Sequence, residues 1–365
     1  MEGFVAKVFH CFFQHYRQVL MMRISTMMKG EANMKYIIGV CLIICLFISP
    51  TFGQASVLEE KSSEEIFAER MALYKKTEAL TGVPWYYIAG VDSYERGLRR
   101  ARNDLPDEEG YVGIFIPSEK WVGVENPNSE DTSPVSISLF NGIGLDGNGD
   151  GLADQTNDED LLYTFAHMLA SFGTDDTNLR IGLWDYYQRD KAIELIKGHA
   201  EIYRTFGTLD LRKRVFPLPL NYNYSYRGTW GHSRGWGGRR IHEGTDLFAG
   251  YGTPVRSTTY GIVELKGWNK FGGWRIGIRD TNNVYHYYAH LTGFEKGVER
   301  GTIVEPGTVV GYVGSSGYGK PGTQGKFPPH LHYGMYKDNG YFEWSFDPYP
   351  SLRAWEKLER QSRRK

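Results

Sequence analysis

Two histidines lie one residue apart in the stretch PPHLHYG, residues 328–334. In an extended segment the side chains alternate between faces, so His330 and His332 should point the same way while Leu331 points into a core. Two imidazoles that share one small volume can bind a metal ion or move a proton. A His-x-His triplet also arises by chance, so its meaning depends on what else the sequence places beside it.

A second cluster of metal-ligand residue types occurs in RIHEGTDLFAG, where three residues separate His242 from Asp246. Gly244 and the β-type sequence around it favour a strand that runs into a loop. Together with His332, the pair supplies two imidazoles and one carboxylate, which leaves a fourth metal position open for water. That composition is typical of catalytic zinc rather than structural zinc.

His290, near the end of VYHYYAHL, and His330 are two further imidazoles that need not bind the metal. Zinc can bring the pKa of a bound water to about 7, and a neighbouring imidazole can accept its proton. A second imidazole can stabilise the oxyanion of a tetrahedral intermediate. His286 and His232 are interpreted instead as structural, hydrogen-bonded histidines.

Short β-strands must position these residues, because the chain beyond residue 217 consists of Val-, Ile-, Tyr- and Thr-rich runs separated by glycines. The earlier part has helical periodicity. The segments predicted to be helical are 63–81, 84–95, 160–172 and 186–206. We therefore expect an α+β multidomain fold with an all-α half (63–206), a linker (207–217), an all-β half built on an antiparallel sheet (218–350) and a basic, solvated tail (351–365).

Composition excludes several classes of site. The net charge of −1 over 365 residues argues against nucleic-acid binding, which needs a basic face. The three cysteines all precede residue 50, so the rest of the chain offers neither thiolate ligands nor a cysteine nucleophile. No protein partner is predicted.

The early apolar run resembles a secretory leader. Residues 34–55 contain a lysine, an apolar stretch at 36–49 and a small-residue exit, which predicts a signal peptide or an N-terminal anchor. Since such a leader should begin near the N-terminus, we expect Met34 to be the true start and residues 1–33 to be a mis-assigned extension. The protein is therefore expected to be exported.

The order and spacing of HEGTD, GTPV, YAHL and HLH resemble the lysostaphin-like (LytM) zinc endopeptidases, which cut the peptide part of peptidoglycan. The resemblance covers residues 214–350. It implies an open antiparallel sheet with the site in a groove. It also implies zinc as cofactor and peptidoglycan as binding partner. The zinc ligands would be His242, Asp246 and His332, and the catalytic histidines His290 and His330.

The stretch GTWGHSRGWGGRRIHEGTDLFAG and the order of the two halves resemble the sporulation endopeptidases that cut the L-alanyl-D-glutamate bond of spore cortex. This resemblance implies a place in the cell wall or the spore intermembrane space. The residues themselves do not select that bond over a D-alanyl or a cross-bridge bond.

The helical half contains VPWYYIAGVDSYERGL, which resembles the segment that carries the single catalytic glutamate of lytic transglycosylases and other lysozyme-like domains. Glu95 occupies that position. The adjacent Arg96 departs from the pattern and would keep Glu95 ionised, which makes a poor general acid. Two alternatives therefore remain beside the peptidase: glycan cleavage through Glu95, and a non-catalytic wall-binding scaffold.

DGNGDGLAD places oxygen ligands at calcium-loop spacing. The candidate ligands are Asp146, Asn148, Asp150 and Asp154. Asn157 stands where such loops carry a bidentate acid, so a solvated turn rich in Asp and Asn is the alternative to a calcium site.

Overall fold

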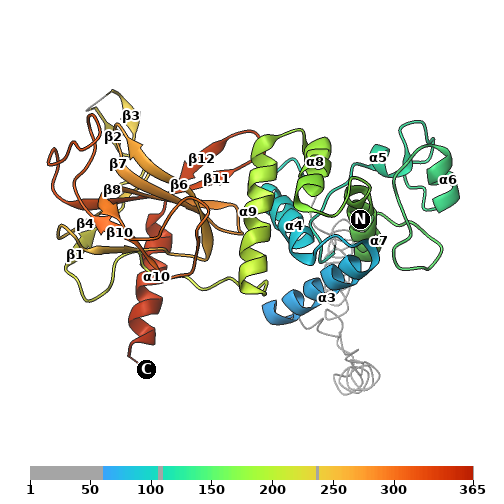
Figure 1. The fold of residues 1–365 in the computed structure, drawn as a ribbon, viewed down its shortest axis with the longest axis horizontal. Helices are drawn as coiled ribbons and strands as arrows, with labels where there is room; N and C mark the ends of the chain where they lie inside the picture. The colour runs from blue at the N-terminus through green and yellow to red at the C-terminus, as the bar shows by residue number, and fades with distance from the viewer. Residues whose placement is uncertain (1–60, 106–109, 236–237, 365) are drawn as a thin grey trace, which may run out of the picture. The chain divides into compact units, whose positions relative to one another are not determined.

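The computed structural model describes residues 61–105, 110–235 and 238–364 (Figure 1). The predicted leader at 34–55 and the extension at 1–33 lie outside these ranges. Within them, no helix combines the length and the apolar character that crossing a membrane requires. The chain from Lys61 onward forms one compact unit.

Capping residues define both ends of the first described helix. The hydroxyl of Ser62 accepts a hydrogen bond from the Glu65 backbone N–H, and the Glu65 carboxylate accepts one from the Ser62 N–H. Gly82 ends the helix at a φ of 75°, a conformation that favours glycine. The helices ahead of the sheet are α3 (Ser63–Thr81), α4 (Trp85–Arg99), α5 (Ser118–Val122), α6 (Pro134–Leu139), α7 (Asp158–Ala170), α8 (Asp176–Tyr187) and α9 (Asp190–Phe206).

Helix α4 is the centre of the helical half, and nearly all of its side chains are buried. It packs against α9 at a point where Gly90 leaves no room for a side chain. A Cβ at Gly90 would lie 2.8 Å from the backbone oxygen of Ile196. The predicted helical region in this half is confirmed, whereas an all-α, lysozyme-like domain stays a prediction.

The strand-rich half, yellow to red in Figure 1, forms an antiparallel sheet, as predicted. Its main strand order is β1-β4-β11-β8-β7-β6-β9, with β12 beside β11 and β10 pairing with β5 and β8. A separate hairpin joins β2 to β3. The strands are β1 (Tyr224–Tyr226), β2 (Ser233–Arg234), β3 (Arg240–Ile241), β4 (Thr245–Ala249), β5 (Pro254–Arg256), β6 (Gly261–Asn269), β7 (Gly273–Arg279), β8 (Val284–Phe294), β9 (Ile303–Val304), β10 (Val309–Val313), β11 (His330–Asp338) and β12 (Glu343–Phe346).

Strand β11 lies between β4 and β8, and its register places the histidines. His332 stands opposite Asp246 of β4 on one side and Ala289 of β8 on the other. Leu331 is fully buried beneath the sheet, so the alternation predicted for the HLH triplet is present. The sheet thereby brings residues 86 positions apart in the chain to neighbouring sites.

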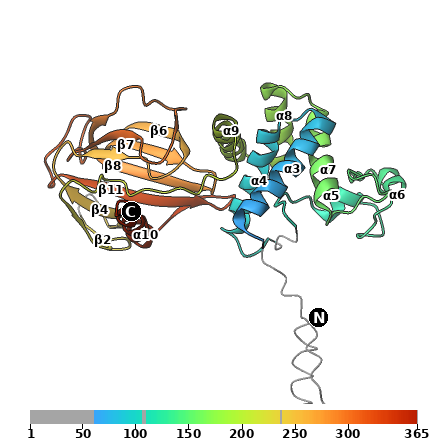
Figure 2. The same cartoon turned by 90° about the horizontal axis from the view of Figure 1, so that it is seen from below.

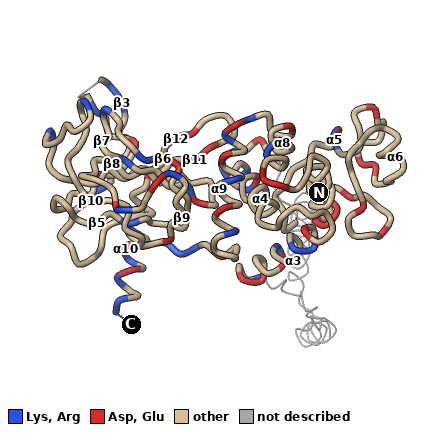
Figure 3. Tube along the Cα trace, in the orientation of Figure 1, with Lys and Arg blue, Asp and Glu red and all other residues tan. Residues whose placement is uncertain are grey.

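The C-terminal residues were expected to form a basic, solvated tail, and this is wrong. Residues Tyr349–Ser362 form helix α10, which lies against the sheet (Figure 2) and carries acidic as well as basic side chains (Figure 3). Leu352 and Trp355 are buried in the core of the β half. The amphipathic spacing of these two apolar residues outweighs the basic character of the last residues.

The segment 207–217 was expected to act as a stiff linker between two domains. In the structure its two ends are packed rather than free. Leu209 and Leu211 belong to the core of the helical half, and Phe216 belongs to the core of the sheet. The connection is therefore held at both ends by burial of apolar side chains.

Candidate metal and catalytic site

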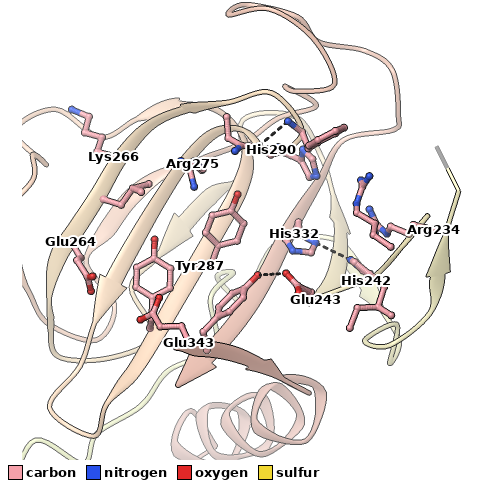
Figure 4. Close-up of a pocket in the computed structure, with 18 of the residues that line it drawn as sticks. Arg234, His242, Glu243, Glu264, Lys266, Arg275, Tyr287, His290, His332 and Glu343 are labelled. Atoms are coloured by element: carbon pink, nitrogen blue, oxygen red, sulfur yellow. Dashed lines mark hydrogen bonds between the residues drawn. The ribbon is translucent and has the colours of Figure 1, made fainter. Parts of the chain in front are cut away.

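Three of the predicted ligands converge at the β4–β11 pairing. The Nε2 of His242 lies 2.9 Å from Nδ1 of His332, and Oδ1 of Asp246 lies within 3.1 Å of both nitrogens. Figure 4 shows His242 and His332 facing each other. Within the described ranges this is the one set of three or more His, Cys, Asp or Glu residues whose ligand atoms converge closely enough to hold a metal ion.

Backbone groups fix the orientation of His242. Its Nδ1 lies 2.9 Å from the backbone oxygen of Thr229, so Nδ1 donates there and Nε2 presents its lone pair to the site. Gly244 allows the HEGTD loop to approach β11, because a Cβ at this position would lie 2.6 Å from the Tyr333 oxygen and 2.7 Å from Cε1 of His332. The glycine of this motif is thus a packing requirement of the site.

Asp246 divides its two oxygens between the candidate metal position and an arginine. Oδ1 faces the two histidines, while Oδ2 accepts a hydrogen bond of 2.5 Å from Nη2 of Arg234. Burial alone would raise the pKa of Asp246, but the imidazoles of His242 and His332 beside it hold that pKa well below its usual range. The carboxylate is therefore ionised, as a metal ligand must be.

The imidazoles at His290 and His330 lie beside this set, with ring centroids 4.6 Å apart. The Nδ1 of His290 lies 2.7 Å from the Ser316 backbone oxygen, and Nδ1 of His330 lies 2.7 Å from the Pro328 oxygen. Each ring therefore donates from Nδ1. When neutral, each presents Nε2 as a proton acceptor, and after protonation Nε2 becomes a hydrogen-bond donor.

His290 has an unusual backbone. Its φ of 62° lies in the left-handed region, which residues with a Cβ adopt rarely and which is often found at functional sites. Its backbone N–H donates to the Gly272 oxygen at 2.8 Å. The bend in β8 at this residue turns the ring of His290 toward His330 and His332, whose centroids lie 4.6 and 5.9 Å away.

The buried imidazoles of His290 and His332 are neutral near pH 7. Burial lowers the pKa of His332 to about 4, and burial together with the nearby His330 and His332 lowers the pKa of His290 to about 3. Neutral imidazole nitrogen and ionised carboxylate oxygen are the donors that zinc accepts in a thiol-free chain. The residues present therefore fit a zinc ion held by His242, Asp246 and His332.

A groove of about 840 Å³ adjoins these residues. Its lining combines aromatic and charged side chains from several strands, and Figure 4 shows them over the face of the sheet that carries His332. Tyr287 and Tyr336 form part of the floor, and Glu264 and Glu343 lie farther along. A groove lined in this way over the face of a sheet can hold an extended peptide.

The histidines interpreted as structural lie outside the convergent set. His286 is buried on the opposite face of the sheet, where its Nδ1 lies 2.7 Å from the Tyr333 hydroxyl and its Nε2 lies 3.4 Å from Asp280. His232 sits in the hairpin ahead of His242, and its backbone oxygen accepts from the His242 N–H.

Glu95 is almost completely buried in α4, and the effect expected from Arg96 is wrong. Arg96 turns away and forms an ion pair with Asp92. Burial raises the pKa of Glu95 to about 7, although a 2.6 Å hydrogen bond from the Tyr187 hydroxyl works in the opposite direction. The carboxyl group is therefore far more often protonated than the sequence alone suggests.

The candidate calcium residues do not form a convergent ligand group within the described residues. Asp146 accepts hydrogen bonds from the backbone N–H groups of Gly149 and Gly151, as in an Asx-rich turn. The Oδ1 of Asp154 accepts hydrogen bonds from the backbone N–H and the hydroxyl of Thr156. Calcium binding stays a prediction that titration calorimetry can test.

Sequence reasoning missed several residues that shape the site. Arg234 and Thr229 orient two of the candidate ligands, and neither was assigned a role from the sequence. The only signal that could have found them is their position in the Gly-rich stretch just ahead of HEGTD. Tyr287 and Arg275, which line the groove, alternate with buried residues on β8 and β7, so their exposure follows from strand parity once the sheet is known.

Comparison with known proteins identifies the family. The model of peptidase family M23 matches residues 240–344. The L-Ala–D-Glu endopeptidase of Bacillus subtilis (strain 168) is 57% identical over 331 residues, which cover 91% of this chain and 100% of that protein. The chain belongs to peptidase family M23. The predicted class of activity, that of a metallopeptidase and peptidoglycan endopeptidase, is confirmed by this membership.

More distant relatives match the M23 part of the chain. Lysostaphin of Staphylococcus staphylolyticus is 32% identical over 116 residues, which cover 31% of this chain and 22% of that protein. The crystallised catalytic domain of lysostaphin from Staphylococcus simulans is 30% identical. That match covers 36% of this chain and 93% of that domain, with a TM-score of 0.29.

Proposed function

We propose that this M23 peptidase is a zinc-dependent enzyme that hydrolyses the L-alanyl-D-glutamate bond of the peptidoglycan stem peptide. The observation that carries the proposal is the convergence of His242, Asp246 and His332 beside two further imidazoles. The choice of bond is supported by the 57% identity to an L-Ala–D-Glu endopeptidase over that protein's whole length.

Zinc would be held by Nε2 of His242, Nδ1 of His332 and Oδ1 of Asp246, the atoms that face one another in the structure. When bound, the ion supplies a Lewis acid and lowers the pKa of water. The chain's own contribution is to keep these donors fixed. Thr229 and Arg234 do so by occupying the other polar atom of His242 and Asp246.

His330 is the proposed general base. Because its Nδ1 donates to the Pro328 oxygen, Nε2 of the neutral ring can accept a proton from the attacking water.

His290 is the proposed oxyanion stabiliser. Its Nε2 can donate only in the protonated ring, so this role requires the negative charge that develops on the substrate oxygen to favour the imidazolium form.

The test is mass spectrometry of purified peptidoglycan digested by the full chain with zinc. We expect L-alanine to remain on the lactyl group and new N-terminal D-glutamate to appear. A chelator should abolish these products. His330→Ala should lower the rate by about 10²- to 10⁴-fold while zinc content is retained. His232→Ala, outside the convergent set, is the matched control and should keep full activity. Cleavage at another bond, or chelator-resistant cleavage, would contradict the proposal.

Export is part of the same proposal, because peptidoglycan lies outside the cytoplasmic membrane. The resemblance to sporulation endopeptidases supports a substrate in the cell wall or the spore cortex. Mass spectrometry of the protein recovered from sporulating cells would locate the mature N-terminus. A mature chain that retains residues 1–33 would contradict both the assigned start and the leader at 34–55.

Glycan cleavage through Glu95 is a second candidate function, favoured by one observation. A buried carboxyl whose pKa is raised to about 7 can act as a general acid at neutral pH. This activity would yield anhydro-sugar products that persist in a chelator and disappear in Glu95→Gln. Absence of such products from the zinc-free protein would leave the helical half without a glycan-cleaving role.

A further inference from the structure

One face of the sheet carries both the catalytic residues and a row of groove residues. The register places Tyr287 of β8 opposite Gly334 of β11 on one side and Gly277 of β7 on the other. Arg275 lies two residues before Gly277 and therefore shares this face. It lines the same groove as His290 and His332.

Arg275 is a half-buried cation without an acidic partner. Its Nε is inaccessible to solvent and has no hydrogen-bond partner, and no carboxylate of the described residues lies within ion-pair distance of it. Arg279, four residues farther along β7, differs because it pairs with both Glu264 and Glu343. A carboxylate ligand would supply the acceptor that Nε of Arg275 lacks.

Arg275 is separated from the candidate metal position by one aromatic ring on the groove floor. Its Cζ lies 5.9 Å from the centroid of the Tyr287 ring, and the same ring lies 5.9 Å from the His332 ring. Figure 4 shows Tyr287 between these two residues on the groove floor. An anionic group of the substrate that lies over the Tyr287 ring, on the leaving side of the scissile amide, would therefore face the guanidinium.

The other basic side chains that line the groove are less suited to this role. Lys266 is paired with Glu299 at 2.6 Å, and Arg234 is paired with Asp246 at 2.5 Å. Arg240 stacks over the Phe271 ring, and Arg300 is exposed, so solvent screens its charge. A guanidinium in a partly dry groove can bind a carboxylate through two parallel hydrogen bonds, which an exposed ammonium cannot reproduce.

We propose that Arg275 is a specificity residue that binds the free α-carboxylate of the D-glutamate on the leaving side of the scissile bond. This inference rests on the proposed L-alanyl-D-glutamate specificity. In that substrate the chain continues through the γ-carboxyl group of glutamate. The α-carboxylate therefore stays free and is attached to the carbon that bears the scissile nitrogen. The enzyme would thus prefer stem peptides whose α-carboxyl group is not amidated.

The test compares two synthetic L-Ala-γ-D-Glu-diamino acid tripeptides, acylated at the N-terminus, that differ only in having an α-carboxylate or an α-carboxamide. The full-length zinc-loaded protein is assayed, and kcat/KM is measured from the amine released. The wild type should prefer the carboxylate by about 10- to 100-fold, the range expected for a hydrogen bond to a charged group. Arg275→Gln should lower kcat/KM for the carboxylate tripeptide by that factor and leave kcat/KM for the carboxamide tripeptide unchanged. Its preference should therefore fall to near unity.

Two further variants exclude a merely structural effect. Arg275→Lys keeps the charge and should retain part of the preference. Lys266→Gln removes a paired cation from the same groove and should leave the preference unchanged. The carboxamide tripeptide lacks the carboxylate that Arg275 is proposed to bind. Its rate of cleavage therefore shows whether each variant is correctly folded.

The outcomes are distinguishable. A wild type that cleaves both tripeptides equally, or an Arg275→Gln variant that slows both by the same factor, overturns the role of Arg275 while the bond specificity stands. A wild type that cleaves neither tripeptide between alanine and glutamate overturns the bond specificity and the role of Arg275 together.

Discussion

Arg234 and Asp246 form a 2.5 Å contact that fixes which carboxylate oxygen faces the candidate metal position. Because Oδ2 is held by Nη2 of Arg234, Oδ1 is left to face His242 and His332. The arginine reaches the site from the β2–β3 hairpin rather than from the main sheet. The hairpin is therefore part of the metal site, although it supplies none of the three ligands.

Arg234→Ala should weaken zinc binding by about 10- to 100-fold, because partners that orient metal ligands typically contribute that much to affinity. Competition against a chromogenic chelator measures the affinity. Arg240→Ala is the matched control, since Arg240 pairs with Arg234 in the hairpin register but stacks over Phe271. Equal affinity in both variants would show that the Arg234 contact does not support the ligand set.

Gly244→Ala should disturb the same site from the opposite side. The added Cβ would lie 2.6 Å from the Tyr333 oxygen, so the loop carrying His242 must move away from β11. We expect a loss of about 1 to 3 kcal/mol in the free energy of unfolding, typical of overpacking, together with weaker zinc binding. Gly293→Ala is the control, because a Cβ there meets no atom within 4 Å. Unchanged zinc affinity in Gly244→Ala would contradict the packing argument.

Glu95→Gln should change how stability depends on pH. The folded-state pKa of Glu95 is about 7, above its ordinary value of 4.5, so the folded protein binds more protons than the unfolded chain between these values. This carboxyl therefore stabilises the fold least at high pH, and its contribution is lost as pH rises from 4.5 to 7. Urea unfolding measures the free energy of unfolding at each pH. Relative to the wild type, that of Glu95→Gln should rise by about 2 to 3 kcal/mol between pH 4.5 and 7. A constant difference would mean that Glu95 titrates normally.

Leu352→Ala should destabilise the β half by about 2 to 5 kcal/mol, because the side chain is fully buried. Leu358→Ala on the same helix removes a side chain that is 58% exposed, and it should change stability by less than about 0.5 kcal/mol. Thermal unfolding of the two variants provides the comparison. Similar midpoints would show that α10 does not form part of the folded core.

The sequence was sufficient for residues whose positions depend on local spacing. Period-two alternation places His330 and His332 on one face, and the HEGTD spacing places His242 beside Asp246. Long-range register then decides which strands meet, and neither motif encodes it. Arg234 reaches Asp246 because the fold brings the β2–β3 hairpin to β4, so its role could not be derived from the sequence alone.

The predicted and the observed structure differ most in the partners of charged side chains and in which side chains are buried. Arg96 follows Glu95 directly, yet helical geometry points it at Asp92, four residues earlier, and leaves Glu95 to the hydrophobic interior. In the last segment, net basicity concealed the apolar pair Leu352 and Trp355. In both places, side-chain direction mattered more than adjacency in the chain.

Helix α10 begins at Tyr349, beyond the end of the M23 match at residue 344. Trp355 lies 6.4 Å from the ring of Tyr333, the residue that follows His332 on β11. A recombinant catalytic fragment cut at the family boundary would therefore expose an apolar surface directly behind the catalytic strand. Such a fragment would tend to aggregate during purification, whereas one that extends through Ser362 would keep that surface covered.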